Sequence, residues 1–317
     1  MSETRISKII TNTTFLFSIG IIGISVISVI FPALIISQTY EFPLDLNPFE
    51  TSPWLLPIFF SVISLLTFGF LHYKKKLPFS LSNTIDLILN FELSKRISII
   101  LGLSILAIYI GFTIPELFID ESEQWPDYIV LESALNIWPS TDHLSVYIKE
   151  QNTRYVRMIL LEFSQDIFQN IKFLPFVASV FTVIFTALIT IQLSKKRFAG
   201  IIAMLVLLSS VTFTDFDTIA VYENFWVLFY LISLYSINKR WWHASPVNFI
   251  LSIFTKAFTA TYFWMNFFYI YRATIPTKTK LLLFASYGIV LGITYWIFEN
   301  GRSIIYDDII RYDFNAF

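Results

Sequence analysis

A long apolar run, Ile97 to Phe118, ends almost directly before a pair of acids, Asp120 and Glu121. A helix needs about 20 apolar residues to cross the hydrocarbon core of a bilayer, so this run is long enough to span a membrane. The run therefore predicts a transmembrane helix with two carboxylates at its mouth. Charged groups in such a position are costly to place and are typical of functional sites.

The composition extends this interpretation to the whole chain. Of its 317 residues, 56% are hydrophobic and only 14% are charged, and the mean hydropathy is +0.66. A soluble domain of this size could not cover so much apolar surface with polar groups. The abundance of aromatic residues, with 34 Phe and 16 Tyr, suits lipid-facing and interfacial positions. The lipid bilayer is therefore an expected partner.

Several classes of function are excluded by what the chain lacks. The net charge of −1 gives no field that would attract a nucleic acid. The absence of cysteine excludes disulfides, thiol catalysis and thiolate metal sites. Only three histidines are present, far apart in sequence, which argues against a histidine-rich metal centre. With 9 scattered glycines, the chain also has no P-loop and no dinucleotide-binding motif.

The apolar runs predict an all-α, polytopic integral membrane protein with about nine transmembrane helices. The predicted spans are Phe15–Ser37, Pro53–Tyr73, Ile97–Phe118, Phe173–Ser194, Phe198–Phe213, Ile219–Ser236, Pro246–Thr255, Phe258–Tyr271 and Leu281–Phe298. The two short runs that flank Lys256 are interpreted as a broken hairpin, because a charge between them favours a turn that reaches a polar cavity.

The orientation follows from Lys and Arg residues in the short loops. With nine spans, every basic cluster lies on one side, which is therefore the cytoplasmic side, and the loops on the other side are acidic. The clusters are Arg5 and Lys8, Lys74–Lys76 with Lys95 and Arg96, Lys195–Arg197, Lys239 and Arg240, and Arg272 with Lys278 and Lys280. A count of eight spans would place the last cluster outside. We therefore expect a cell-membrane protein with a cytoplasmic N-terminus and an external C-terminus.

We expect two parts in this chain: an N-terminal extension of two spans with a basic cytoplasmic loop, residues 1–96, and a module of seven spans, residues 97–317. The largest loop, residues 119–172, is predicted to be external and to contain interfacial helices. Its latter half, Arg154 to Ile171, has apolar residues at roughly helical spacing. This amphipathic helix either lies in the outer membrane interface or packs on the outer ends of the spans.

Several short segments of the module carry a family resemblance. They are Phe118-Ile119-Asp120-Glu121, Asn170 to Ser179 with Lys172-Phe173-Leu174-Pro175, the basic turn Lys195 to Gly200, Ala220-Val221-Tyr222-Glu223, and Phe254-Thr255-Lys256. In order and spacing, the chain from Ile97 to the C-terminus resembles the GT-C superfamily of membrane glycosyltransferases, in particular the protein mannosyltransferase-like and aminoarabinose transferase-like branch.

The resemblance implies a seven-span module that transfers a sugar from a polyprenyl-phosphate carrier to an external acceptor, which is a protein, a lipid or a glycan. It also implies that an acid of the first external loop is the base, so that Asp120 is the first choice and Glu121 the second. The alternative role of Asp120 is that of a solvated helix end. A different class of function also stays open: a non-catalytic or partner-dependent membrane subunit, or a transport-type protein. Thr218, where the family frequently has Arg, favours this alternative.

Binding of the substrate is assigned to a second set of residues: Lys256, Arg302, Asp127, Glu223 and Asp217. Lys256 is expected to hold the lipid-linked phosphate, helped by the start of the following helix. Alternatively, Lys256 pairs with Asp215, Asp217 or Glu223. Arg302 is a weaker phosphate candidate.

The remaining candidates are acids. Asp127 would bind the acceptor or a divalent cation, or would simply be an exposed loop charge. The segment Thr214 to Asp217 has the spacing of a metal–nucleotide motif. Nucleotide-sugar donors are cytoplasmic, so only a metal or a pairing with Lys256 stays open there. The only cofactor that the sequence leaves open is a divalent cation.

Overall fold

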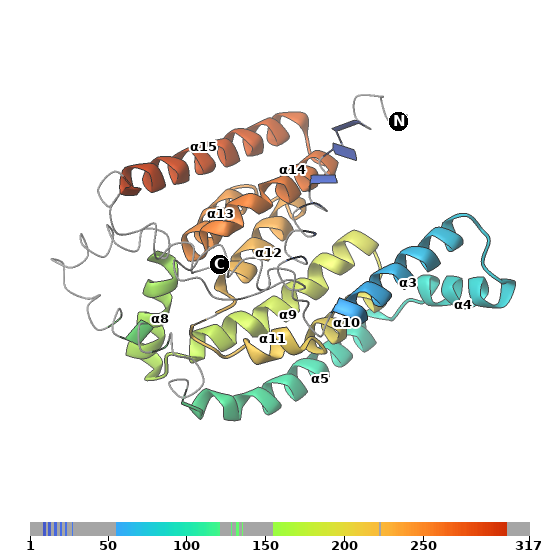
Figure 1. Ribbon diagram of the computed structural model, residues 1–317, viewed down its shortest axis with the longest axis horizontal. Helices are drawn as coiled ribbons and strands as arrows, with labels where there is room; N and C mark the ends of the chain where they lie inside the picture. Colours follow the sequence, from blue (N-terminus) through green and yellow to red (C-terminus); the bar gives the residue numbers. More distant parts are fainter. Residues whose placement is uncertain are drawn as a thin grey trace, which may run out of the picture. The chain divides into compact units, whose positions relative to one another are not determined.

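The computed structural model describes residues 55–120, 155–221 and 223–302, together with the isolated residues 9, 10, 12, 13, 16, 17, 20, 23, 27, 128, 131, 132 and 135. Over these residues the chain is all-helical and contains no strand (Figure 1). The chain separates into two compact units, residues 93–310 with 1–14, and residues 15–92 with 311–317. The predicted span Phe15–Ser37 and both chain ends lie largely outside the described residues.

The larger unit begins with α5 and ends with α15. Its elements in chain order are α5 (Lys95–Thr113), the 3-10 helix η1 (Ile114–Phe118), α8 (Tyr155–Phe168), α9 (Phe173–Ser194), α10 (Arg197–Leu208), α11 (Val211–Asp215), α12 (Phe225–Asn238), α13 (Ala244–Thr255), the 3-10 helix η2 (Ala257–Tyr262), α14 (Phe263–Arg272) and α15 (Thr277–Arg302). Ser94 caps α5, because its side chain accepts a hydrogen bond from the backbone N–H of Ile97.

Four helices of the described residues are long and apolar enough to cross a membrane: Leu55–His72, Lys95–Phe118, Phe173–Ser194 and Thr277–Trp296. Each coincides with a predicted span, and together they indicate a membrane-associated protein. Three further apolar helices, α10, α12 and α13, are shorter than a full span. The run predicted as one span from Ile219 divides, since residues 219–221 belong to a buried connection and α12 begins only at Phe225.

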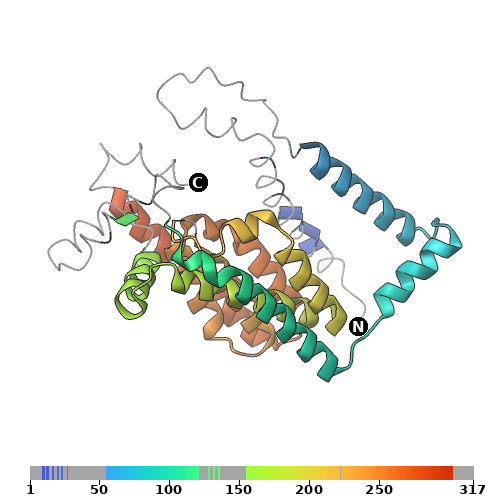
Figure 2. The same cartoon turned by 90° about the horizontal axis from the view of Figure 1, so that it is seen from below.

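The core of the larger unit is formed where the apolar faces of neighbouring helices meet. Helix α12 packs on α9 and α13, α9 packs on α10, and α10 packs on α5. Figure 2 shows these helices from below. The approach of α9 and α10 is close enough to require glycine at position 200, where a Cβ atom would lie 2.5 Å from Cγ1 of Ile191. The largest fully buried side chains include Tyr287 and Phe249, which are in contact.

A buried polar network joins α12, α13, α14 and α15. Asn266 donates hydrogen bonds to the hydroxyl groups of Ser233 (3.1 Å) and Tyr287 (2.8 Å). Ser245 donates to the carbonyl of Ser233 (2.8 Å), so its 2.8 Å contact with Tyr287 requires the tyrosine to be the donor. Ser233 must then donate to Tyr287 at 2.6 Å. One set of proton positions therefore satisfies every hydroxyl group, and the network fixes how the four helices pack.

Helix α8 has two apolar faces. The face with Met158 and Leu161 is buried, and α8 packs on α9 and α13, which confirms that the amphipathic helix packs on the ends of other helices. A second row, Ile159, Phe163 and Ile167, is about half exposed (52%, 49% and 56%). This row has the spacing of one helix face and suits contact with a membrane interface.

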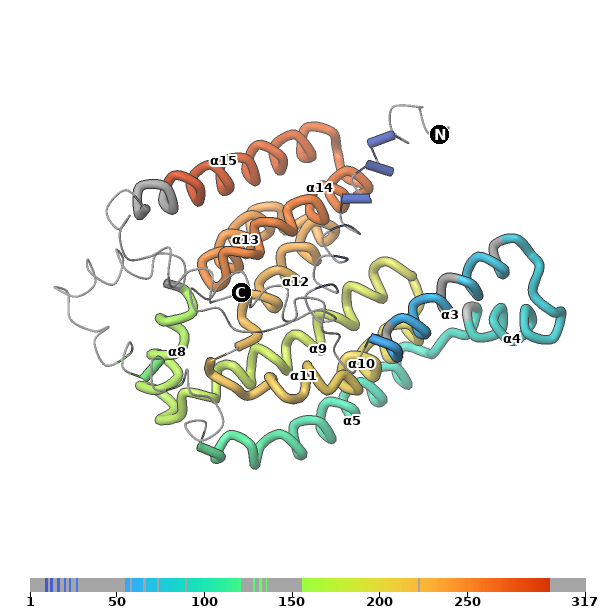
Figure 3. The backbone as a smooth tube through the Cα atoms, in the orientation of Figure 1, coloured from blue at the N-terminus to red at the C-terminus, as the bar shows by residue number. Residues whose placement is uncertain are grey.

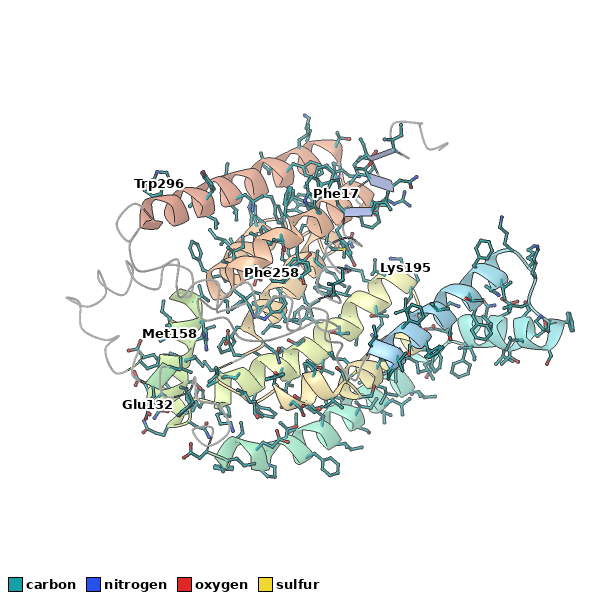
Figure 4. The ribbon with its side chains drawn as sticks, in the orientation of Figure 1. Phe17, Glu132, Met158, Lys195, Phe258 and Trp296 are labelled. Carbon is teal, nitrogen blue, oxygen red and sulfur yellow. The ribbon has the colours of Figure 1, made fainter. Side chains whose placement is uncertain are left out.

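The helices of the larger unit run back and forth between two ends, as the tube in Figure 3 shows. We call one the acidic end; it contains η1, α8, the connection 216–224 and Lys256. We call the other the basic end; it contains the start of α5 and the turns α9–α10, α12–α13 and α14–α15. In Figure 4, Met158 lies at the acidic end and Lys195 at the basic end.

The helices given for the smaller unit are α3 (Leu55–Tyr73) and α4 (Phe79–Asn90). A short basic turn joins them, in which Lys75 has a left-handed backbone (φ 54°). His72 Nε2 lies 3.7 Å from Oδ1 of Asp86, so the two helices are linked by an ion pair when the imidazole is protonated.

Candidate functional site

The connection between α11 and α12, residues 216–224, is the polar centre of the acidic end. Most of its described residues are buried, among them Asp217 (2% exposed), Ala220 (0%) and Glu223 (5%). A buried connection cannot leave its backbone and charged groups unpaired without a large loss of stability. Helices α5, α8 and α9 supply the partners.

Helix α8 contributes Arg157, which is 7% exposed. Its Nε lies 2.9 Å from Oε2 of Glu223, and its Nη2 donates hydrogen bonds to the carbonyls of Val221 (2.6 Å) and Ala220 (3.3 Å). Both side chains of the ion pair are nearly excluded from solvent (8% and 6% exposed). The planar guanidinium suits this role, because it presents several donors in fixed directions. Arg157 therefore holds the connection against α8.

Helices α5 and α9 contribute the partners of Asp217. The hydroxyl of Tyr109 donates to Oδ2 of Asp217 at 2.7 Å, and Ser179 donates to the backbone carbonyl of Asp217 at 2.7 Å. Oδ1 of Asp217 is buried without a hydrogen-bond partner. Nearby, Thr218 donates a long hydrogen bond (3.4 Å) to the carboxylate of Glu116. The carboxyl groups of Asp217 and Glu116 thus lie in a region that is partly excluded from solvent.

The surroundings change the acidity of Asp217. Burial raises the pKa of this carboxyl to about 7, and the charge of Glu116 acts in the same direction, while the hydrogen bond from Tyr109 partly opposes them. A carboxyl with a pKa near 7 exchanges protons close to neutral pH, which is the property that general acid–base chemistry requires. Asp217 is, however, almost completely buried, so a substrate could not reach it without a movement of the connection.

The end of η1 is held by the segment that leads into α9. The ammonium group of Lys172 donates to the carbonyls of Glu116 (2.6 Å) and Ile119 (3.0 Å), and the side chain of Asn170 donates to the carbonyl of Leu117 (2.9 Å). The Glu116 carbonyl also accepts the capping hydrogen bond from the backbone N–H of Ile119. Carbonyls at a helix end lack the full set of partners inside the helix, so a cation and an amide there stabilise the end of η1. This contact fixes the position of Asp120, which follows directly.

Asp120 lines a pocket of about 240 Å³ at this place. The other lining residues are Leu117, Phe118, Ile119, Tyr128, Gln165, Gln169, Asn170, Ile171 and Lys172. Asp120 itself is exposed. The pocket therefore combines an accessible carboxylate, several amide side chains and an apolar wall, which are groups that can bind a hydroxyl-bearing ligand.

Lys256 lies where α13 ends. Its backbone is extended (φ −149°, ψ 110°), which confirms the predicted break between the two short apolar segments. Its ammonium group lies 5.8 Å from the centre of the Trp226 ring, a cation–π contact, and Trp226 stacks on Tyr262. The following helix η2 has 6 residues, so it is too short to support a phosphate by its dipole.

The structure brings some predicted residues together and leaves others undescribed. Asp217 and Glu223 lie six residues apart within the same buried connection, and Lys256 contacts the ring of Trp226 at the start of α12, which follows this connection. Asp120 lines the pocket at the end of η1. Arg302 is the last residue of α15 and its side chain is not described. Glu121 and Asp127 lie outside the described residues. Over the described residues, no group of three acids or histidines is arranged to hold a metal.

Sequence reasoning assigned no site role to Tyr109, Glu116 or Arg157, and it missed the role of Lys172 at the end of η1. Arg157 had a signal, because it interrupts the apolar face of the predicted helix 154–171. Glu116 had a weaker one, as an acid within the last turn of an apolar run. Nothing in the sequence of α5 distinguishes Tyr109 from the other aromatic residues.

Comparisons with known proteins add no relative. No family model, no curated protein and no solved structure matches this chain.

Proposed function

We propose that this chain is an integral membrane glycosyltransferase of GT-C type, which transfers a sugar from a polyprenyl-phosphate carrier to an external acceptor. The observation that carries the proposal is the accessible Asp120 carboxylate in a pocket at the mouth of an apolar helix. Its position depends on Lys172 and Asn170, which bind the end of η1. A carboxylate held at the wall of a pocket suits a general base.

The proposed reaction needs few groups. Asp120 takes the proton of the acceptor hydroxyl, whose oxygen then forms a bond to the anomeric carbon of the sugar. The bond between that carbon and the carrier phosphate breaks, and polyprenyl phosphate leaves, with inversion at the anomeric carbon. Lys256 would bind the phosphate, and the Trp226 ring beside it would contact apolar parts of the donor. A second cation, Arg302, would assist from the end of α15.

The finer topology belongs to the same proposal. We propose about nine spans in all, with the acidic end and the loop 119–172 outside, the N-terminus in the cytoplasm and the C-terminus outside. The distribution of charge between the two ends supports this orientation, since the turns of the basic end contain no Asp or Glu, whereas the described acids of the larger unit gather at the acidic end. A donor in the outer leaflet would then reach Asp120 and Lys256.

The test is sugar release from a radiolabelled polyprenyl-phosphate donor by purified protein in lipid. Asp120→Asn removes the base and should lower the rate by a factor of about 10² to 10⁴. The matched control is Asp166→Asn, which neutralises an exposed acid on α8 outside the pocket and should leave the rate unchanged. An unchanged rate in Asp120→Asn would remove Asp120 from the chemistry.

A second candidate function is a non-catalytic membrane subunit. The observation in its favour is that Asp217 and Glu223 have structural partners in Tyr109 and Arg157. This candidate predicts no sugar release from any donor by a folded sample, and co-purification of a membrane protein partner from its native membrane. A transport-type protein would instead show solute uptake in reconstituted vesicles.

A further inference from the structure

The basic end combines cations with aromatic rings in two of its turns. In the α12–α13 turn, the ammonium group of Lys239 lies 5.5 Å from the centre of the Tyr235 ring, and Trp241 contacts the same ring edge-on at 6.0 Å. In the α14–α15 turn, Lys280 lies 5.7 Å from the Tyr271 ring and donates a hydrogen bond to the Tyr271 carbonyl at 2.6 Å. These cations are therefore held beside aromatic surface.

The third turn, α9–α10, lies against the start of α5. Arg197 donates a hydrogen bond to the carbonyl of Leu93 at 3.1 Å, which brings Lys195 to Arg197 next to Lys95 and Arg96. None of these turns, nor the start of α5 from residue 93 to 96, contains an acid; all four stretches are fully described. Glu92 directly precedes the start of α5, so the basic end as a whole carries an excess of cations over acids.

We propose that the basic end binds the phosphate headgroups of anionic phospholipids. The argument rests on the combination of charge and exposed aromatic surface. Trp241 is 56% exposed, and indole rings are favoured at the level of lipid headgroups, where one edge meets hydrocarbon and the other meets water. Lys and Arg side chains at the headgroup level are attracted to an anionic leaflet, and each adds a similar favourable amount to the binding free energy.

A lipid fits this surface better than a nucleic acid does. The cations lie at the ends of apolar helices, and exposed apolar side chains such as Leu193 (61%), Leu281 (64%) and Trp241 flank them. A nucleic acid would cover the cations and leave this apolar surface in water. A phospholipid covers both, with its phosphate on the cations and its chains along the helices.

The experiment measures lipid binding by the purified full chain in detergent, by native mass spectrometry with phosphatidylglycerol or phosphatidylcholine as the probe. We expect tighter binding of phosphatidylglycerol. Two double variants test the surface in separate turns, Lys195→Gln with Lys196→Gln, and Lys239→Gln with Arg240→Gln. Each removed cation should weaken phosphatidylglycerol binding about fivefold, so each pair should weaken it roughly twentyfold or more.

The controls keep the charge, with Lys195→Arg and Lys196→Arg in one variant and Lys239→Arg in another, and should bind phosphatidylglycerol like the unchanged protein. Equal binding of the two lipids, or equal losses in the Gln and Arg variants, would overturn the proposal. So would full displacement of phosphatidylglycerol by millimolar inorganic phosphate or by an oligonucleotide, because either result would mean a general anion site. No turnover is measured, so the outcome does not depend on the proposed sugar transfer.

Discussion

The ion pair between Arg157 and Glu223 leads to a prediction about stability. The loss of stability should be larger when one of the two charges is removed than when both are removed together. Glu223→Leu leaves a guanidinium buried without its carboxylate, which should destabilise the fold by about 3–5 kcal/mol. Arg157→Met removes the guanidinium that balances the buried carboxylate of Glu223, and it also removes the donor to two buried carbonyls, at Ala220 and Val221. Each unsatisfied carbonyl adds about 1–3 kcal/mol, so this variant should be the least stable of the set.

The double variant, Arg157→Met with Glu223→Leu, contains neither charge of the pair. The carbonyls of Ala220 and Val221 still lose their guanidinium donor, which corresponds to a loss of about 2–6 kcal/mol, and the two new apolar side chains fill the space. The double variant should therefore be more stable than Arg157→Met alone by about 3 kcal/mol. A second substitution that restores stability is unusual. It would therefore distinguish a coupled ion pair from two residues that stabilise the fold independently.

The assay is thermal unfolding in detergent, followed by the amount of monodisperse protein that survives heating. The expected order of unfolding temperatures is unchanged protein first, then the double variant, then Arg157→Met last. Asp166→Leu on the same helix is the control, and since Asp166 is exposed its unfolding temperature should differ little from that of the unchanged protein. A double variant less stable than both single variants would refute the reasoning, because it would mean that the two charges do not depend on each other.

Two further predictions concern buried polar groups. Because burial raises the pKa of Asp217 from about 4 to about 7, the folded state holds a proton that the unfolded state has lost between these pH values, so this group lowers stability as pH rises, by up to about 1.4 kcal/mol per pH unit. Asp217→Asn should flatten the dependence of unfolding temperature on pH between 4.5 and 7.5, and equal slopes in the two proteins would contradict the shift. Tyr287→Phe removes a hydroxyl that makes three hydrogen bonds with Ser233, Ser245 and Asn266, and should destabilise the fold by about 1–3 kcal/mol in thermal unfolding. Tyr295→Phe, on the exposed side of the same helix, is its control, and a similar loss there would show that the network is not the cause.

The sequence predicted the long helices well and the short ones less well. An apolar run of about 20 residues without a charge specifies a helix by itself, which is why Phe173–Ser194 was predicted to the residue. The run from Ile219 to Ser236 was equally apolar but contains Glu223 and Asn224, where the chain turns into α12. Hydropathy averages over such a pair and does not register that an arginine from another helix neutralises the acid.

The candidate site was predictable only in part. The acids at the mouth of an apolar run and the cation between two short runs are visible as exceptions to a local pattern, and so Asp120 and Lys256 were singled out. The partners of the buried acids come from residues more than 60 positions away, as with Tyr109 and Asp217 or Arg157 and Glu223. Such pairings depend on how helices pack, and a single sequence contains no periodicity that specifies them.

The buried acids nevertheless bear on the proposed phosphate site, because they determine where α12 begins. Arg157 and Tyr109 hold the connection from α8 and α5, and Ser179 holds it from α9. The connection leads directly into Trp226, whose ring faces the ammonium group of Lys256, and Ser252 on α13 donates to the Trp226 carbonyl at 2.7 Å. Loss of either acid's partner would therefore shift the ring against which Lys256 is placed. In the proposed enzyme, Asp217 and Glu223 act as positioning residues, and contact with the substrate is left to Asp120 and Lys256.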